Sequence, residues 1–212
     1  MKLHFQSPFL GEDKEKNMKT TKISEMSTVK MVFAAILTAL VIILQFIGQT
    51  IRLGPFMISL VLIPIVIGAA VCGPKIGGWL GFVFGIFVLI SGDAAAFLTV
   101  NVLGTVITVL LKGMLCGLAA GIVYKALEGK NKALAVIVAA IACPVVNTGV
   151  FLLGCVIFFM DTIVLWANGS NVIKYMFLGL VGGNFLVELA INLVFGPTIV
   201  RLVNMAEMKF LK

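Results

Sequence analysis

Three polar side chains stand out because the segments around them are otherwise apolar. Lys112 lies in ITVLLKGMLCGLAAG, Asn147 in IACPVVNTGVFLLG, and Glu188 in FLVELAINLV. A charged group in the hydrocarbon of a membrane costs at least about 2.5 kcal/mol, so it faces the protein interior, a partner or a polar cavity. An ammonium, a carboxylate and an amide together can form an ion pair or bind a polar organic molecule.

The elements that carry these side chains are predicted to be membrane helices. Of the 212 residues 61% are hydrophobic and 12% charged, and the mean hydropathy is +1.17. The apolar runs are continuous and not alternating, which is typical of helices that cross about 30 Å of hydrocarbon. We therefore expect an all-α membrane protein, a compact bundle of six transmembrane helices. The expected spans are roughly residues 31–48, 55–72, 74–91, 101–127, 133–160 and 176–203.

The distribution of charge predicts the orientation of this bundle. The net charge is +7, and most Lys and Arg residues fall in the tails and in alternate connections between the spans. Such placement follows the positive-inside rule and puts both termini in the cytoplasm, with the protein in the plasma membrane. It argues against nucleic acid as a partner and for the lipid bilayer. The predicted organisation is a polar, partly disordered tail (1–30), the membrane domain (31–203) and a short cytoplasmic tail (204–212).

Depth along the helices predicts that the three polar residues share one layer. At about 1.5 Å per residue, Lys112, Asn147 and Glu188 each lie roughly 16–20 Å below the outer surface. Because Glu188 is the only carboxylate at that depth, we predict that it pairs with Lys112, directly or through water. Asn184, Glu188 and Asn192 are four residues apart and share one helix face. That face is expected to line a cavity or a polar seam.

Further polar and aromatic residues are expected on the outer halves of the same helices and in the outer loop. Amide, hydroxyl and aromatic groups around a buried ion pair suit an amphipathic organic ligand. The predicted substrate-binding residues are Asn101, Thr105, Lys112, Asn147, Trp166, Asn184 and Glu188. The alternative is a structural ion pair that only fixes helix register, as in a membrane scaffold.

The sequence lacks the residues that metal sites and several kinds of catalytic site require. The only histidine, His4, lies in the tail, and Asp93 and Asp161 have no matching second carboxylate, so no metal site is expected. The sequence contains no GxSxG, HExxH or P-loop motif. We therefore predict neither an enzyme nor a protein with its own cofactor. Uphill transport would need an ion gradient or partner subunits.

Small residues at helical spacing predict close helix packing. Two glycine ladders repeat every four residues: Gly73, Gly77, Gly81 and Gly85, and then Gly113, Gly117 and Gly121. Such ladders let membrane helices approach closely, and we interpret both as internal contacts of the bundle. A shorter pair, Ala35 and Ala39, occurs in the first span and by itself indicates either internal or external packing.

The order of these features resembles a known family. The AILTA pair in the first span, IPIVIGAAVCGPKIGGWLGFVFG through the second and third, and LLKG in the fourth are similar to the S components of energy-coupling factor vitamin transporters. The likeness covers residues 31–203. It implies a binding subunit with a vitamin pocket open to the outside, built from the outer halves of the fourth to sixth helices.

The resemblance also implies partners. S components dock on a transmembrane coupling subunit and two ATPase subunits, which use the ATP, and are proposed to topple in the membrane to release the ligand. The family's docking surface maps onto Ala35 and Ala39. We therefore predict a micronutrient-binding subunit, with a self-sufficient proton-coupled transporter using Glu188 as the main alternative. The identity of the vitamin is left open, because Lys112 and Arg52 favour a carboxylate whereas Trp166 favours a stacked ring.

Overall fold

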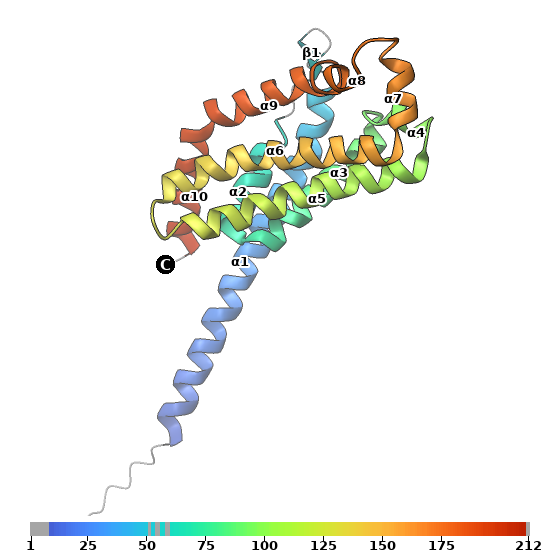
Figure 1. Cartoon of the computed structure of the whole chain (residues 1–212). Coiled ribbons are helices and arrows are strands. Elements are labelled where there is room, and N and C mark those ends of the chain that lie inside the picture. Colours follow the sequence, from blue (N-terminus) through green and yellow to red (C-terminus); the bar gives the residue numbers. More distant parts are fainter. Residues whose placement is uncertain (1–8, 51, 54–55, 58–59, 211–212) are drawn as a thin grey trace, which may run out of the picture.

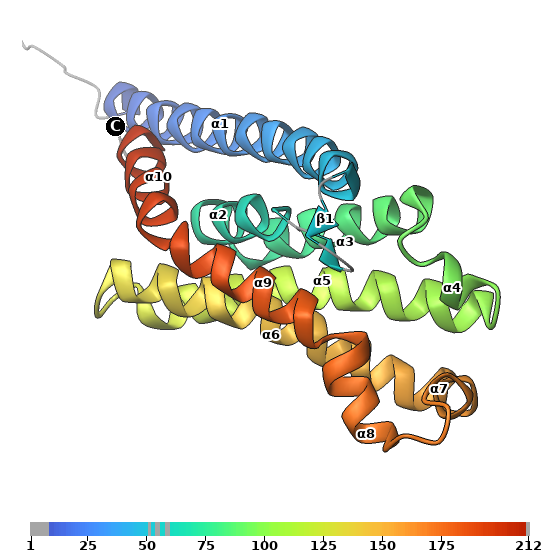
Figure 2. The same cartoon turned by 90° about the horizontal axis from the view of Figure 1, so that it is seen from above.

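Helices make up nearly all of the chain that the computed structural model describes, which comprises residues 9–50, 52–53, 56–57 and 60–210. They are arranged as a bundle (Figures 1 and 2), and Figure 1 shows the start of the first helix projecting from it. The elements are α1 (Phe9–Thr50), β1 (Arg52–Leu53), β2 (Phe56–Met57), α2 (Leu62–Cys72), α3 (Pro74–Ser91), α4 (Ala95–Leu98), α5 (Val102–Leu127), α6 (Lys132–Phe158), α7 (Met160–Trp166), α8 (Val172–Lys174), the π-helix η1 (Tyr175–Leu180), α9 (Gly182–Val194) and α10 (Gly196–Phe210).

Four helices are long and apolar enough to cross a membrane. They are residues Thr28–Gly48 of α1 and the whole of α3, α5 and α6, and a bent pair, Val172–Leu180 with Gly182–Val194, makes a fifth if it counts as one span. The bounds of α3, α5 and α6 lie within two residues of the predicted spans 74–91, 101–127 and 133–160. The all-helical membrane fold is therefore confirmed for these segments, while the count of six spans stays a prediction.

The second predicted span, 55–72, contains a much shorter helix. Residues Arg52–Leu53 and Phe56–Met57 form a small antiparallel hairpin, and α2 begins only at Leu62. With 11 residues, α2 is about 16 Å long, which is too short to cross the hydrocarbon layer alone. Nearly all its side chains are buried, so α2 is a core element of the bundle enclosed by its neighbours.

The sixth predicted span, 176–203, is broken. A π-helix precedes α9, the two segments meet at 42°, and α10 begins after a second break. The breaks fall next to glycines, before Gly182 and before Gly196, where glycine lowers helix propensity. Pro197, in the first turn of α10, has no backbone N–H to continue the hydrogen bonds of α9. The breaks could not be predicted from the continuous apolar run, because hydrophobicity alone does not distinguish one long helix from three shorter ones.

The glycine ladders pack α3 against α5. A Cβ added at Gly77 would lie 2.5 Å from the carbonyl oxygen of Gly117, and one added at Gly81 would collide with the carbonyl oxygen of Gly113. The contact is reciprocal, since a Cβ at Gly113 would meet the backbone of Gly81. The interpretation of the ladders as internal contacts is confirmed for the glycines within α3 and α5, where a Cβ would clash. It is wrong for Gly73, where a Cβ would meet nothing within 4 Å and the positive φ of 96° favours glycine instead.

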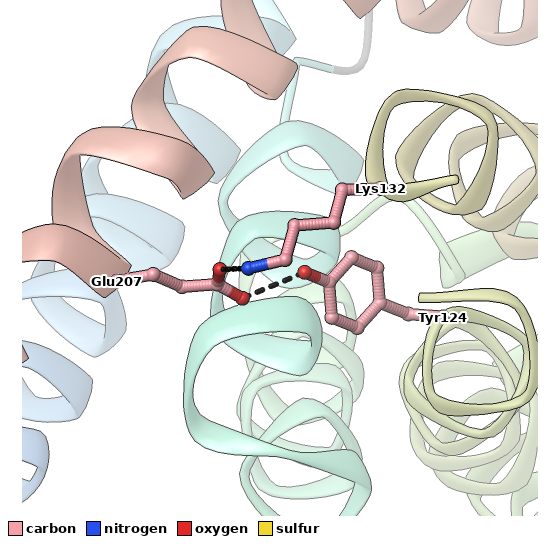
Figure 3. A network of polar contacts seen from close by, with 3 residues as sticks. All are labelled: Tyr124, Lys132 and Glu207. Atoms are coloured by element: carbon pink, nitrogen blue, oxygen red, sulfur yellow. Dashed lines mark hydrogen bonds and ion pairs between the residues drawn. The ribbon is translucent and has the colours of Figure 1, made fainter. Parts of the chain in front are cut away.

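A polar network fixes α10 to the ends of α5 and α6 (Figure 3). The buried Tyr124 donates a hydrogen bond of 2.7 Å to one oxygen of Glu207, and Lys132 forms an ion pair of 2.5 Å with the other. Burial of the Glu207 carboxylate opposes its charge, but the hydrogen bonds from Lys132 and Tyr124 outweigh burial and lower its pKa. The network lies at the end of the bundle opposite α4 and α7 (Figure 1).

Candidate functional site

A cavity of about 260 Å³ lies between the helices, and its lining includes Phe97 of α4 and Phe159, the residue before α7. Ligand pockets for small organic molecules begin at about 300 Å³, so the cavity fits a small ligand. The long helices α1, α3, α5 and α6 contribute to its wall, together with α4 and the segment from η1 to α9. Its polar lining residues are Gln45, Asp93, Thr105, Thr108, Lys112, Asn147, Thr148, Asn184 and Glu188.

Helical spacing explains why several of these residues reach one cavity. On α5, Thr105, Thr108 and Lys112 follow the spacing i, i+3, i+7, which is one face of a helix. On α9, Asn184 and Glu188 are one turn apart. All the α5 lining residues fall in its first eleven positions, so the cavity occupies one end of the helix and not its whole length.

Lys112 lies against aromatic rings. Its Nζ is 5.3 Å from the ring centroid of Phe151 and 5.9 Å from that of Phe84, distances at which a cation is attracted to a ring face. Lys112 of α5 and Glu188 of α9 line the same cavity. Among the described residues, however, they do not approach to ion-pair distance. The predicted pair is therefore two opposite charges that line one cavity without direct contact.

Asn147 of α6 lines the cavity together with Glu188 of α9. Asn147 is only 5% exposed, and its Oδ1 has no hydrogen-bond partner in the described part of the chain. The same is true of the Oγ1 of Thr108 and the Oδ1 of Asn184. Buried polar atoms are nearly always paired in folded proteins, so three unpaired atoms around one cavity mark a polar binding surface.

An aromatic cluster forms the wall of the cavity beside α4 and α7. Phe97 packs edge-to-face with Phe151, Phe159 and Trp166, at centroid distances of 5.4, 5.0 and 5.4 Å. Phe97, Phe151 and Phe159 line the cavity, whereas Trp166 lies behind Phe97. The rings offer apolar and aromatic contacts in the same cavity as the amides of Asn147 and Asn184.

Comparison with protein families decides what kind of membrane protein this is. The family model of the ECF transporter substrate-specific component matches residues 29–200. The chain belongs to this family. It is a non-catalytic S component, the subunit of an ECF importer that binds the substrate, and the ATP is used by the ATPases of the importer. A comparison with curated proteins found no match.

Family membership confirms the resemblance inferred from the glycine and alanine motifs, over nearly the same residues. It identifies a multi-pass membrane protein of an importer and decides against a scaffold or a self-sufficient proton-coupled transporter. Among the described residues of the S component, no group of three His, Cys, Asp or Glu side chains could hold a metal ion.

The structure brings together five of the seven predicted binding residues. These are Thr105, Lys112, Asn147, Asn184 and Glu188, all of which line the cavity. Asn101 does not line it. Instead, Asn101 caps the start of α5, where its side chain accepts a hydrogen bond of 2.9 Å from the backbone N–H of Gly104. Asn192 is fully buried beyond the cavity, and its amide donates to the carbonyl of Glu188 at 3.0 Å.

Sequence reasoning missed a polar link at the cavity margin. Gln45 of α1 is 5% exposed and donates a hydrogen bond of 2.6 Å to Asp93, which follows α3. The signal was available for Gln45, since it interrupts the apolar stretch VIILQFIG. The lack of a second carboxylate near Asp93 argues against a metal or acid-base site, but it does not bear on ligand binding.

The exposed face of α1 carries the predicted docking pair of the S component. Ala35 and Ala39 are exposed, whereas Ala34, Leu37 and Val41 are buried against the bundle. The two alanines thus lie on the outer side of α1. An internal packing role for this pair is wrong, because the helix turns its other side to the core.

Proposed function

We propose that this S component captures a vitamin or related micronutrient in the cavity beside α5, α6 and α9. The observation that carries the proposal is the set of unpaired buried polar atoms of Thr108, Asn147 and Asn184 around one cavity with two opposite charges. Thr105, Lys112, Asn147, Asn184 and Glu188 contact the ligand. Trp166 acts through Phe97, and Asn101 acts by holding the start of α5.

The mouth of the cavity faces the outside of the cell, and both termini lie in the cytoplasm of a bacterium. The distribution of cations supports this orientation. Lys75, Lys125, Lys132 and Arg201 lie at the ends of α3, α5 and α6 and on α10, away from the cavity. Lysine and arginine concentrate on the cytoplasmic side of membrane proteins.

The ligand is passed to a coupling subunit that meets the S component at Ala35 and Ala39. Membrane helices associate where small residues let backbones approach, because lipid offers no hydrophobic gain for larger side chains. Ala35 and Ala39 form such a site one turn apart on α1, flanked by the exposed Ile36 and Leu40. Two ATPase subunits then supply the energy through the coupling subunit.

The test separates binding from transport. The purified S component is titrated with a vitamin panel while its unfolding temperature is followed, since a ligand at one hundred times its Kd adds about 2.7 kcal/mol to native stability. Uptake of the bound vitamin is then measured in cells with and without the coupling subunit and ATPases. We expect binding by the S component alone and uptake only with the partners. Uptake that persists without any ATPase would refute the proposal.

A further inference from the structure

The residues that line the cavity offer two opposite kinds of hydrogen-bonding group. Lys112 of α5 presents an ammonium, which only donates, and its Nζ lies over the rings of Phe84 and Phe151. Among the described residues no hydrogen bond or ion pair engages it. The same cavity is lined by the carboxylate of Glu188 and the amides of Asn147 and Asn184.

Two buried amide oxygens in the cavity have no hydrogen-bond partner. The Oδ1 of Asn147 is an acceptor with no partner in the described chain, and it is buried. The Oδ1 of Asn184 is a second such acceptor. The carboxylate of Glu188 also only accepts hydrogen bonds when it is ionised. These three residues therefore require hydrogen-bond donors.

We propose that the ligand is dipolar and that the cavity binds it in one direction. This inference rests on the proposed function and names the class of substrate. A carbonyl or carboxylate oxygen of the ligand accepts from Lys112, and its N–H or hydroxyl groups donate to Glu188, Asn147 and Asn184. The body of the ligand lies along the Phe rings. The ligand bridges Lys112 and Glu188, which explains how two opposite charges share a cavity without direct contact.

The proposal excludes two classes of compound. A ligand that carries only acceptors would leave Asn147, Asn184 and Glu188 without donors, and a purely cationic donor would be repelled by Lys112. A small molecule with both an acceptor end and a donor end satisfies every group. The cavity of about 260 Å³ limits the part of the ligand that it encloses to about the size of a single or fused ring system.

The experiment compares matched probes on the full-length protein in detergent by isothermal titration. The probes are riboflavin, pantothenate, biotin and nicotinamide. The matched analogues are N3-methylriboflavin, which lacks one N–H donor, panthenol, which has an alcohol in place of the carboxylate, and nicotinate. Nicotinamide against nicotinate compares an amide carbonyl with a carboxylate at the Lys112 end, and pantothenate against panthenol compares a carboxylate with a hydroxyl.

Two variants then test which end of the ligand binds Lys112 and which end binds Glu188. For a probe that the wild type binds, Lys112→Met should weaken binding about 10- to 100-fold, as expected for loss of a charged hydrogen bond. It should also abolish the preference for the analogue with the stronger acceptor. Glu188→Gln should weaken binding about tenfold and abolish the preference for the analogue with more donors. Lys125→Met, on the exposed cytoplasmic end of the same helix, is the control and should leave the Kd unchanged.

Each outcome bears on the inference. A probe that binds the wild type, Lys112→Met and Glu188→Gln with the same Kd would overturn it. Equal affinity of the wild type for a parent compound and its donor-methylated analogue would also overturn it. This comparison needs no variant, so it remains valid even if Lys112→Met or Glu188→Gln misfolds. If no probe and no co-purified compound binds the wild type at all, the proposed function fails. That result is distinct from binding without the predicted polarity.

Discussion

Substitution of Gly77 by alanine tests whether the glycine ladder sets the spacing of α3. Its added Cβ would lie 2.5 Å from the Gly117 carbonyl oxygen, about 0.9 Å inside the 3.4 Å at which ordinary contact begins. On the other side it would lie 2.6 Å from the Cβ of Ala69 in α2. Because α3 is held between α5 and α2 at this point, movement away from one helix drives it into the other.

The magnitude follows from two opposing effects. Alanine in a helix is favoured over glycine by about 1 kcal/mol. Overpacking costs about 1 to 3 kcal/mol, and the upper end applies here because the clash is with backbone that cannot change rotamer. We expect Gly77→Ala to lower the free energy of unfolding by about 2 kcal/mol. Gly85→Ala, with 2.9 Å to the Val109 carbonyl oxygen, should lose less.

Gly149 provides the matched control, since it lies within helix α6 and a Cβ there would meet nothing within 4 Å. Gly149→Ala should raise the free energy of unfolding by up to about 1 kcal/mol. The assay is reversible unfolding of each variant by SDS in mixed micelles, followed by circular dichroism. If Gly77→Ala were as stable as Gly149→Ala, the reasoning about the α3 and α5 contact would be refuted.

Three further substitutions have definite expected outcomes. The pKa of Glu207 is lowered in the folded state, so the stability that the ionised carboxylate contributes is present at neutral pH and is lost as the pH falls below about 4. In unfolding titrations from pH 6 to 3, the free energy of unfolding of the wild type should therefore fall by up to about 1 kcal/mol more than that of Glu207→Gln. Replacement of Ala35 and Ala39 by Trp should abolish uptake and leave the ligand Kd unchanged, whereas Ile122→Trp on the exposed face of α5 should retain uptake. Normal uptake by the double variant would remove the docking assignment. Asn101→Ala should lower the free energy of unfolding by about 1 kcal/mol through loss of the helix cap, and the relative affinities of different ligands should not change. A change in ligand preference would place Asn101 in the binding site.

Helix existence and the close α3–α5 contact could be predicted because their signals are local. Apolar runs and glycines at a spacing of four record which face of each helix is buried and which approaches another backbone. Depth counting also brought Lys112, Asn147 and Glu188 into one layer, and the structure places all three around one cavity. Depth could not fix rotation about the helix axis, and so direct pairing of Lys112 with Glu188 was not distinguishable from separation across a cavity.

The roles of Asn101 and Trp166 depended on tertiary placement. Asn101 directly precedes α5, a position where asparagine caps a helix, so a local interaction competes with ligand binding for the same side chain. Trp166 is separated from the cavity by Phe97, a neighbour contributed by the short helix α4. No pattern in the sequence shows which aromatic ring of a cluster faces a cavity. The 42° break before α9 likewise depends on how glycines are used in three dimensions.

The most direct measurement is mass spectrometry of small molecules that remain bound to the protein purified in mild detergent. The wild type is compared with Thr108→Phe, which would fill the cavity from α5, and with Leu111→Phe on the exposed side of the same helix. A cavity that binds the substrate predicts one compound enriched in the wild type and in Leu111→Phe and absent from Thr108→Phe. No enriched compound, or the same compound in all three proteins, would contradict it.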